Sequence, residues 1–303
     1  MTFSSVPAII FVGKARFPFI IQMKKKGLFM LKYKIVASDL DGTLLDSDCR
    51  VSEENFAAIH ALTEKGVHCA IATGRTLNEI PKPILECEDI RYIIYSNGAM
   101  VLDKAEDRRL GACIDQRTIR RMMDVFADYQ VHISVRYDGT CYTDATLPLV
   151  ESADFYRIDP SHVRCVGETG RAIRDFTATV RAMEEAEVFS VFFHSDEEQA
   201  ACKARLEKID GIYIAGICDT NFEIFNIDAG KDKALLRLAD LLGVPEKKTM
   251  SLGDSGNDVA ITKVAGLGLA VSNAQKILKD VADEIICSND EHAMQYVLDH
   301  YFS

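Results

Sequence analysis

Two aspartates in the segment DLDGT (residues 39–43) are the side chains most suggestive of chemistry, because they directly follow the short apolar run KIVAS (residues 34–38). Ligands of parallel sheets bind beyond the carboxyl ends of strands. At such a strand end, Asp39 and Asp41 repel one another and lose hydration. A hard cation with oxygen ligands, such as Mg²⁺, would offset that cost. The plainer alternative is that both residues only cap and turn the chain, since Asp-Gly is a common turn dipeptide.

A second acidic segment, GDSGND (residues 253–258), also follows an apolar run and opens a predicted helix. Taken alone, it could be an ordinary capping loop, because Asp and Asn are favoured at helix N-termini. Taken with the first segment, it predicts that Asp254 lies at the same sheet edge as Asp39. Three or four carboxylates would then meet at one point.

Two further elements could bind an anion. Thr73 and Gly74 stand between a predicted strand and a predicted helix, where a hydroxyl and backbone N–H groups can hold phosphate. Lys231 precedes another predicted helix, and lysine binds phosphate as a point charge. Each signal is weak alone, since a lysine before a helix is usually a solvated surface residue, and Lys233 is a competitor for the same role.

Together these residues supply the parts that phosphoryl transfer requires, namely positioning groups and positive charge around the phosphate. We expect Asp39 to attack phosphorus and form an aspartyl phosphate. Asp41 would protonate the leaving oxygen and later take a proton from water. Mg²⁺ would lie between Asp39 and the phosphate, held also by the Asp41 backbone carbonyl and by Asp254.

The composition narrows the class of protein. The 303 residues carry a formal net charge of -11, which disfavours a nucleic-acid partner. Nine scattered cysteines without a C-x-x-C pair predict reduced thiols and a cytoplasmic location. The apolar stretch near the N-terminus is too short and too charged for a membrane span. We therefore expect a small-molecule enzyme without a membrane partner, acting as a monomer or a homodimer.

Strand and helix patterns alternate from residue 32, change near residue 111 and alternate again from residue 221. Such alternation predicts right-handed βαβ units. The expected fold is α/β, with a Rossmann-like parallel-sheet core, helices on both of its faces and an inserted α+β cap domain. Residues 32–110 and 221–303 would form the core, and residues 111–220 the cap. Residues 1–31 are interpreted as an extension, either disordered or a misassigned start, although a small docking or targeting segment is an alternative.

The ordered set DLDGT, TGR, lysine and GDSGND resembles the haloacid dehalogenase superfamily of phosphatases, most closely its Cof-type branch. The segment SNGA (residues 96–99) and the long insertion are similar to features of that branch. The resemblance covers residues 32–303. Asp232 departs from the glycine that usually follows the lysine in such sequences.

The resemblance implies a nucleophile, an acid/base and a metal-binding group at matching positions of this chain. Asp39, Asp41 and Asp254 would bind Mg²⁺, and Asp258 would support the water shell of the metal. Phosphate-binding residues implied in the same way are Leu40 (through its amide), Thr73, Gly74, Lys231 and Asn257.

The expected activity is hydrolysis of a small phosphorylated metabolite, such as a sugar phosphate, a flavin or pyridoxal phosphate, or a nucleotide. A sugar phosphomutase would use the same aspartyl phosphate, and a catalytically inactive metabolite-binding module is a third reading. The cap would set the specificity. Its candidate residues, each of which could equally be ordinary cap core or surface, are His132, Arg136, Tyr137, Tyr142 and His194.

Overall fold

The computed structural model describes residues 31–218 and 221–303. The predicted N-terminal extension therefore lies outside the described residues, apart from Leu31. Among the described residues, every helix is too short or too polar to cross a membrane.

The first sheet has eight strands in the order β16-β15-β14-β1-β2-β3-β4-β5. The pairs from β16 to β3 are parallel, whereas β4 and β5 join as an antiparallel edge. The strands are β1 (Ile35–Ser38), β2 (His68–Ala72), β3 (Ile90–Tyr95), β4 (Met100–Asp103), β5 (Arg108–Gly111), β14 (Thr249–Gly253), β15 (Leu267–Ala270) and β16 (Glu284–Ile285).

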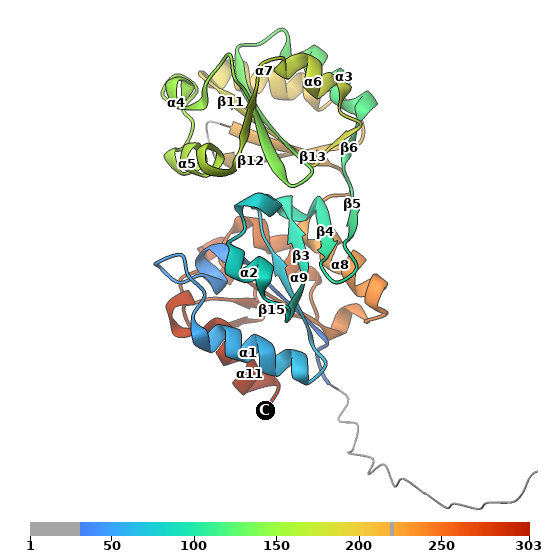
Figure 1. The fold of residues 1–303 in the computed structure, drawn as a ribbon, viewed down its shortest axis with the longest axis vertical. Coiled ribbons are helices and arrows are strands. Elements are labelled where there is room, and N and C mark those ends of the chain that lie inside the picture. The colour runs from blue at the N-terminus through green and yellow to red at the C-terminus, as the bar shows by residue number, and fades with distance from the viewer. Residues whose placement is uncertain (1–30, 219–220) are drawn as a thin grey trace, which may run out of the picture. The chain divides into compact units, whose positions relative to one another are not determined.

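Helices cover both faces of this sheet (Figure 1). On one face, α8 and α9 bury Leu235, Leu238 and Ile261 against Ile35 of β1. On the other, α1 packs with α11, and the Cys69 thiol of β2 lies 3.9 Å from a carbonyl of α1. The helices are α1 (Glu53–Glu64), α2 (Lys82–Glu86), α8 (Lys231–Leu242), α9 (Val259–Val264), α10 (Lys276–Lys279) and α11 (Ala293–Tyr301).

A second sheet, in the order β12-β13-β11-β7-β8-β9, forms the cap. Most of its pairs are antiparallel, and a small two-stranded sheet joins β6 to β10. The strands are β6 (Ile114–Asp115), β7 (Val131–Tyr137), β8 (Thr140–Asp144), β9 (Arg171–Ile173), β10 (Glu185–Ala186), β11 (Val188–Phe193), β12 (Ile212–Cys218) and β13 (Asn221–Asn226). The cap helices are α3 (Gln116–Phe126), α4 (Leu149–Ser152), α5 (Pro160–Thr169), α6 (Phe176–Ala182) and α7 (Asp196–Leu206).

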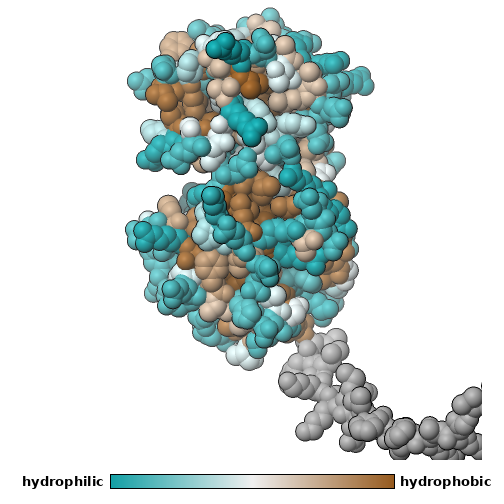
Figure 2. Space-filling view, viewed as in Figure 1, coloured by the Kyte–Doolittle hydropathy of each residue, from teal (hydrophilic) through white to brown (hydrophobic). Residues whose placement is uncertain are grey.

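These two sheets confirm the predicted fold class, an α/β parallel-sheet core with an inserted α+β cap. The strand β13 pairs with β11 and β12, so the cap sheet continues to Asn226, past the boundary proposed at residue 220. The visible face is mostly hydrophilic, with a hydrophobic patch around α4, where Val150 and Phe155 are exposed (Figure 2).

Candidate active site

Asp39 follows the last residue of β1, and its amide donates to the Leu252 carbonyl of the neighbouring strand β14 (3.0 Å). Asp254 follows the last residue of β14 in the same way. Because β1 and β14 are parallel and adjacent, both aspartates emerge at one edge of the sheet. Carboxylate oxygens of Asp39, Asp254 and Asp258 all lie within 4.8 Å of one another.

The Lys231 ammonium lies inside this acidic cluster. Its Nζ donates to Asp39 Oδ1 at 2.8 Å and to Asp258 Oδ1 at 2.7 Å, and all three side chains are buried. Lys231 opens α8, whereas Lys233 lies on the surface and donates to the Ile227 carbonyl. Of the two candidate lysines, only Lys231 is at the site.

Burial and neighbouring charges shift the pKa values of these groups. Burial raises the pKa of Asp39, Lys231 opposes the rise, and Asp258 adds to it. Burial, then Asp258, raises the pKa of Asp254 to about 6. Although burial disfavours the charged ammonium, Asp39 and Asp258 raise the pKa of Lys231. One ammonium therefore faces three carboxyl groups, which leaves the cluster short of positive charge.

The donor set of the acidic cluster fits a magnesium ion, because it offers hard oxygen ligands. Asp39 and Asp254 each present a carboxylate there. Asp258 is more fully engaged, since its Oδ2 accepts the amides of Asp254 (3.1 Å) and Ser255 (3.2 Å). Its geometry suits the predicted supporting role.

Asp41 occupies a different environment. Its carboxylate is 54% exposed and accepts two bonds from Arg75, at 2.9 and 2.6 Å. Gly42 directly follows Asp41 and has a φ of +70°. A Cβ at this position would lie 2.7 Å from Asp254 Oδ2. The glycine thus lets the two acidic loops approach each other.

The predicted phosphate-binding residues lie around the same sheet edge. Thr73 is fully buried, and its Oγ1 accepts the Arg75 amide at 3.1 Å. Gly74 lies against the Asn97 side chain, since a Cβ added to Gly74 would lie 2.9 Å from Asn97 Oδ1. The Asn257 amide donates to the same Asn97 Oδ1 at 3.1 Å. The Leu40 side chain is fully buried below the loop.

A cavity of about 940 Å³ opens over these groups. Its core-side lining includes Asp39, Asp41, Gly74, Asp254 and Asn257. Its cap-side lining comes mainly from α5, β11, β13 and Arg136 of β7. The cavity is therefore placed to hold a ligand between the acidic loops and the cap.

Of the five cap residues singled out from the sequence, only Arg136 lines this cavity. His132 is fully buried against the rings of Tyr156 and Phe192. His194 stacks on the exposed Phe155. Tyr142 packs against the apolar core of the cap.

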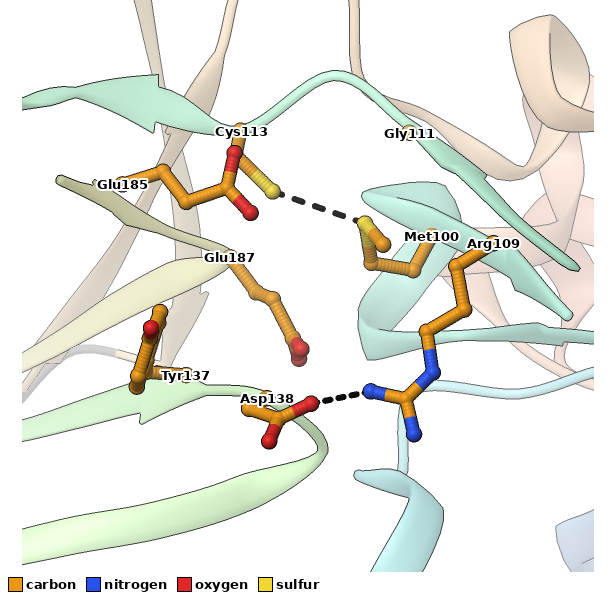
Figure 3. A pocket seen from close by; sticks show the side chains of 8 residues that line it. All are labelled: Met100, Arg109, Gly111, Cys113, Tyr137, Asp138, Glu185 and Glu187. Atoms are coloured by element: carbon orange, nitrogen blue, oxygen red, sulfur yellow. Dashed lines mark hydrogen bonds and ion pairs between the residues drawn. The ribbon is translucent and has the colours of Figure 1, made fainter. Parts of the chain in front are cut away.

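Tyr137 instead lines a smaller cavity of about 290 Å³ between β4–β5 and the cap strands (Figure 3). An ion pair between Arg109 and Asp138 spans one side of it. Beside it, Glu187 of the cap accepts the Ser96 hydroxyl at 2.6 Å and the Gly139 amide at 2.8 Å, and burial raises the pKa of this glutamate. The contact with Ser96 ties the cap to the segment SNGA, and the contact with Gly139 holds the turn between β7 and β8 of the cap.

Sequence reasoning did not single out Asn97, Ser190 or Glu223 as site residues, yet all three line the large cavity. The signal for Asn97 was only its place in SNGA. Glu223 lies in the alternating segment NFEIFN (residues 221–226), whose pattern marks a polar face but does not identify its partners.

The haloacid dehalogenase-like hydrolase family model matches residues 36–298. The chain belongs to this family. Phosphatase YwpJ of Bacillus subtilis is 29% identical over 285 residues, covering 88% of this chain and 99% of that protein. The 5-amino-6-(5-phospho-D-ribitylamino)uracil phosphatase YcsE of the same organism is 28% identical, covering 88% and 95%.

Solved structures agree with this assignment. A haloacid dehalogenase-like hydrolase from B. subtilis has a TM-score of 0.71 at 29% identity, covering 88% of this chain and 99% of its own. One from Bacteroides thetaiotaomicron has a TM-score of 0.73 at 22% identity, covering 89% and 100%, and so supports the fold. The resemblance drawn from the sequence is confirmed, and the chain is an enzyme of phosphatase type.

Gly98 of the SNGA segment should be intolerant of a side chain. Its φ is +85°, and a Cβ would lie 2.2 Å from the Gly230 carbonyl group and 2.5 Å from the Lys231 amide. We expect Gly98→Ala to cost about 2–5 kcal/mol of unfolding free energy, because backbone strain adds to overpacking at the start of α8. Urea unfolding measures this.

Gly66→Ala is the matched control for Gly98→Ala. Gly66 has nearly the same φ, +86°, but nothing lies within 4 Å of its would-be Cβ. It should therefore lose only the conformational part, about 1 kcal/mol. Equal losses in the two variants would show that the packing against Gly230 contributes nothing.

The pKa of Asp254 predicts a pH dependence of stability in Mg²⁺-free buffer. Its pKa rises from 3.8 to about 6 on folding, so the folded state binds its proton more tightly than the unfolded state does. The stability due to this group should therefore fall as pH increases from about 4 to about 6. Unfolding free energies of the wild type minus those of Asp254→Asn, measured across that range, test the sign. A difference that rises with pH contradicts it.

Proposed function

We propose that this protein is a Mg²⁺-dependent phosphatase that hydrolyses a small phosphorylated metabolite through an aspartyl phosphate on Asp39. The observation that carries the proposal is the buried cluster of Asp39, Lys231, Asp254 and Asp258 beneath a cavity of about 940 Å³. Phosphoryl transfer depends on positioning and on neutralising charge, and this cluster has the groups for both.

In the first step, an Asp39 carboxylate oxygen forms a bond to phosphorus while the bond from phosphorus to the leaving oxygen breaks. The leaving oxygen takes a proton from Asp41. In the second step, Asp41 accepts a proton from water, whose oxygen binds phosphorus and releases inorganic phosphate and the Asp39 carboxylate. Bound Mg²⁺, held by Asp39, Asp254 and the Asp41 carbonyl, would supply positive charge to the phosphate oxygens.

The pairing of Asp41 with Arg75 bears on this cycle. Asp41 accepts two hydrogen bonds from the Arg75 guanidinium as a carboxylate. The carboxylate is the form that can take a proton from water in the second step. Donation in the first step requires Asp41 to carry a proton.

Around the phosphate we assign Leu40 (through its amide), Thr73, Gly74, Lys231 and Asn257 as binding groups. Lys231 neutralises charge, and the loop at Thr73 and Gly74 offers a hydroxyl and amides.

Sugar phosphates, flavin or pyridoxal phosphates and nucleotides are the candidate substrates. The relative YcsE is named a phosphatase of 5-amino-6-(5-phospho-D-ribitylamino)uracil, and this name supports a small metabolite as the substrate. Eight described cysteines are free, which suits a cytoplasmic enzyme, proposed to be a monomer or a homodimer.

Phosphate release from a panel of phosphorylated metabolites, with Mg²⁺ and with EDTA, tests the proposal. We expect release with Mg²⁺, loss of release with EDTA and recovery when Mg²⁺ is added back. Release that continues unchanged in EDTA would exclude the metal, and no release from any ester, including p-nitrophenyl phosphate, would exclude the phosphatase activity.

A further inference from the structure

The cap sheet carries a row of polar side chains on the face toward the large cavity and packs its other face against the apolar core of the cap. Ser134 of β7, Ser190 of β11 and Glu223 of β13 lie directly opposite one another across three neighbouring strands. Side chains of directly paired residues share one face of a sheet, and the next residue along each strand faces the other way. Those next residues, including Val135, Val191 and Ile224, belong to the apolar cap core.

Glu223 is the most highly connected member of this polar row. Its Oε1 accepts the Ser190 hydroxyl at 3.0 Å and forms an ion pair with Arg136 Nη2, also at 3.0 Å. Its Oε2 accepts the Asn97 side-chain amide at 3.2 Å. The Glu223 side chain is 5% exposed and lines the cavity, so its hydrogen bonds are little weakened by bulk water.

This network reaches two proposed phosphate-binding residues of the core. Asn97 receives the Asn257 amide on its Oδ1 at 3.1 Å while it donates to Glu223. Arg136 donates through Nη1 to the Gly74 carbonyl at 3.2 Å. Asn97 adopts a left-handed conformation, φ +52°, which its amide fixes by donating to the Thr73 carbonyl at 3.0 Å. Such backbone strain concentrates at functional sites.

We propose that Glu223 determines specificity by accepting a hydrogen bond from a hydroxyl of the leaving group, with Asn97 and Arg136 as positioning residues. This inference rests on the proposed phosphatase function. A carboxylate oxygen has two lone pairs, so Oε2 can accept a hydroxyl beside the Asn97 amide or in its place. The substrate class is therefore a phosphate monoester whose leaving group carries hydroxyl donors.

The charges around Glu223 argue against a second phosphate on the substrate. Arg136 is already paired with Glu223 and bonded to Gly74, so its charge is largely neutralised. The other polar group in the row beside Glu223, Ser190, is neutral. Acidic side chains also outnumber arginines in the cavity lining. A neutral hydroxyl group matches this surface better than an anion does.

Two five-carbon substrates test the inference, ribitol 5-phosphate and n-pentyl phosphate, which differ only in hydroxyl groups. The wild type with Mg²⁺ should have a kcat/KM at least about tenfold higher for ribitol 5-phosphate. Glu223→Gln should reduce this ratio about tenfold, because a neutral amide oxygen is a weaker acceptor than a carboxylate. A merely structural role would lower both kcat/KM values alike and leave their ratio unchanged.

Matched variants keep the test decisive. Glu185→Gln, an exposed residue of β10 outside the large cavity, should retain the wild-type ratio. Glu223→Gln leaves Arg136 buried without its partner, so the double variant Arg136→Gln/Glu223→Gln is measured in parallel. It should also lose the preference for ribitol 5-phosphate. Thermal unfolding checks that each variant is folded. If one of the two Glu223 variants is unfolded, the substrate ratio of the other one tests the inference.

The outcomes separate the two proposals. Equal wild-type kcat/KM values for the two substrates, or an unchanged ratio in the Glu223 variants, would overturn the inference and leave the phosphatase function standing. Failure of the wild type to release phosphate from either substrate and from p-nitrophenyl phosphate would overturn the proposed function itself.

Discussion

Asp39→Asn should lower the rate of Mg²⁺-dependent phosphate release by about 10³-fold or more, while the protein stays folded. The amide cannot attack phosphorus to form the covalent intermediate, so the whole two-step route is lost. Stability should be retained, because Lys231 keeps its ion pair with Asp258, and an amide of the same shape removes one of the three carboxyl groups that face a single ammonium. Phosphate release and thermal unfolding, measured on the same preparation, test both halves.

The exposed Asp48 supplies the control for this variant, since Asp48→Asn makes the same chemical change outside the cavity. It should keep wild-type activity. Acid-quenched wild-type enzyme should also carry covalent phosphate that Asp39→Asn lacks. Substantial Mg²⁺-dependent activity in Asp39→Asn would mean that another group is the nucleophile.

Lys231→Met should weaken both the fold and the activity. The substitution leaves Asp39 and Asp258 buried without the ammonium that lies 2.7–2.8 Å from them. Removing one partner of a buried ion pair costs about 3–5 kcal/mol. Loss of a cation that stabilises the transition state should lower kcat by about 10²-fold or more. Added Mg²⁺ should recover part of the stability, because it restores positive charge, but not the activity.

Lys233→Met is the matched control, two residues along the same helix and on the surface. It should change the unfolding free energy by no more than about 0.5 kcal/mol. Urea unfolding of both variants, with and without Mg²⁺, separates the two lysines. Equal stability of Lys231→Met and Lys233→Met would remove Lys231 from the charge balance of the site.

The strand ends that carry the acidic residues were predictable because their strands are short apolar runs buried on both faces. The residues of β1 are all buried, and so are those of β14. Such runs identify parallel strands from local sequence alone. Two acidic segments directly after them could then be assigned to one sheet edge.

Other elements depend on pairing that local sequence does not reveal. The edge strand β5 contains Arg108 and Arg109 and is largely exposed, so it has no apolar pattern to mark it as a strand. The contact between Asn97 and Glu223 joins residues 126 positions apart. Neither side chain is unusual in its own segment. Which of the polar residues on the cap meet the catalytic loops therefore follows only from the assembled sheets.

The place of β1 in the first sheet has a consequence for synthesis on the ribosome. Its neighbour β2 emerges soon after it, but its other neighbour, β14, lies beyond the entire cap. Until β14 is made, one edge of β1 has no partner, and closing so long a separation is entropically costly and slow. A cap that folds first would bring its two ends together and shorten that search. The inserted domain would then speed assembly of the nascent chain as well as cover the substrate.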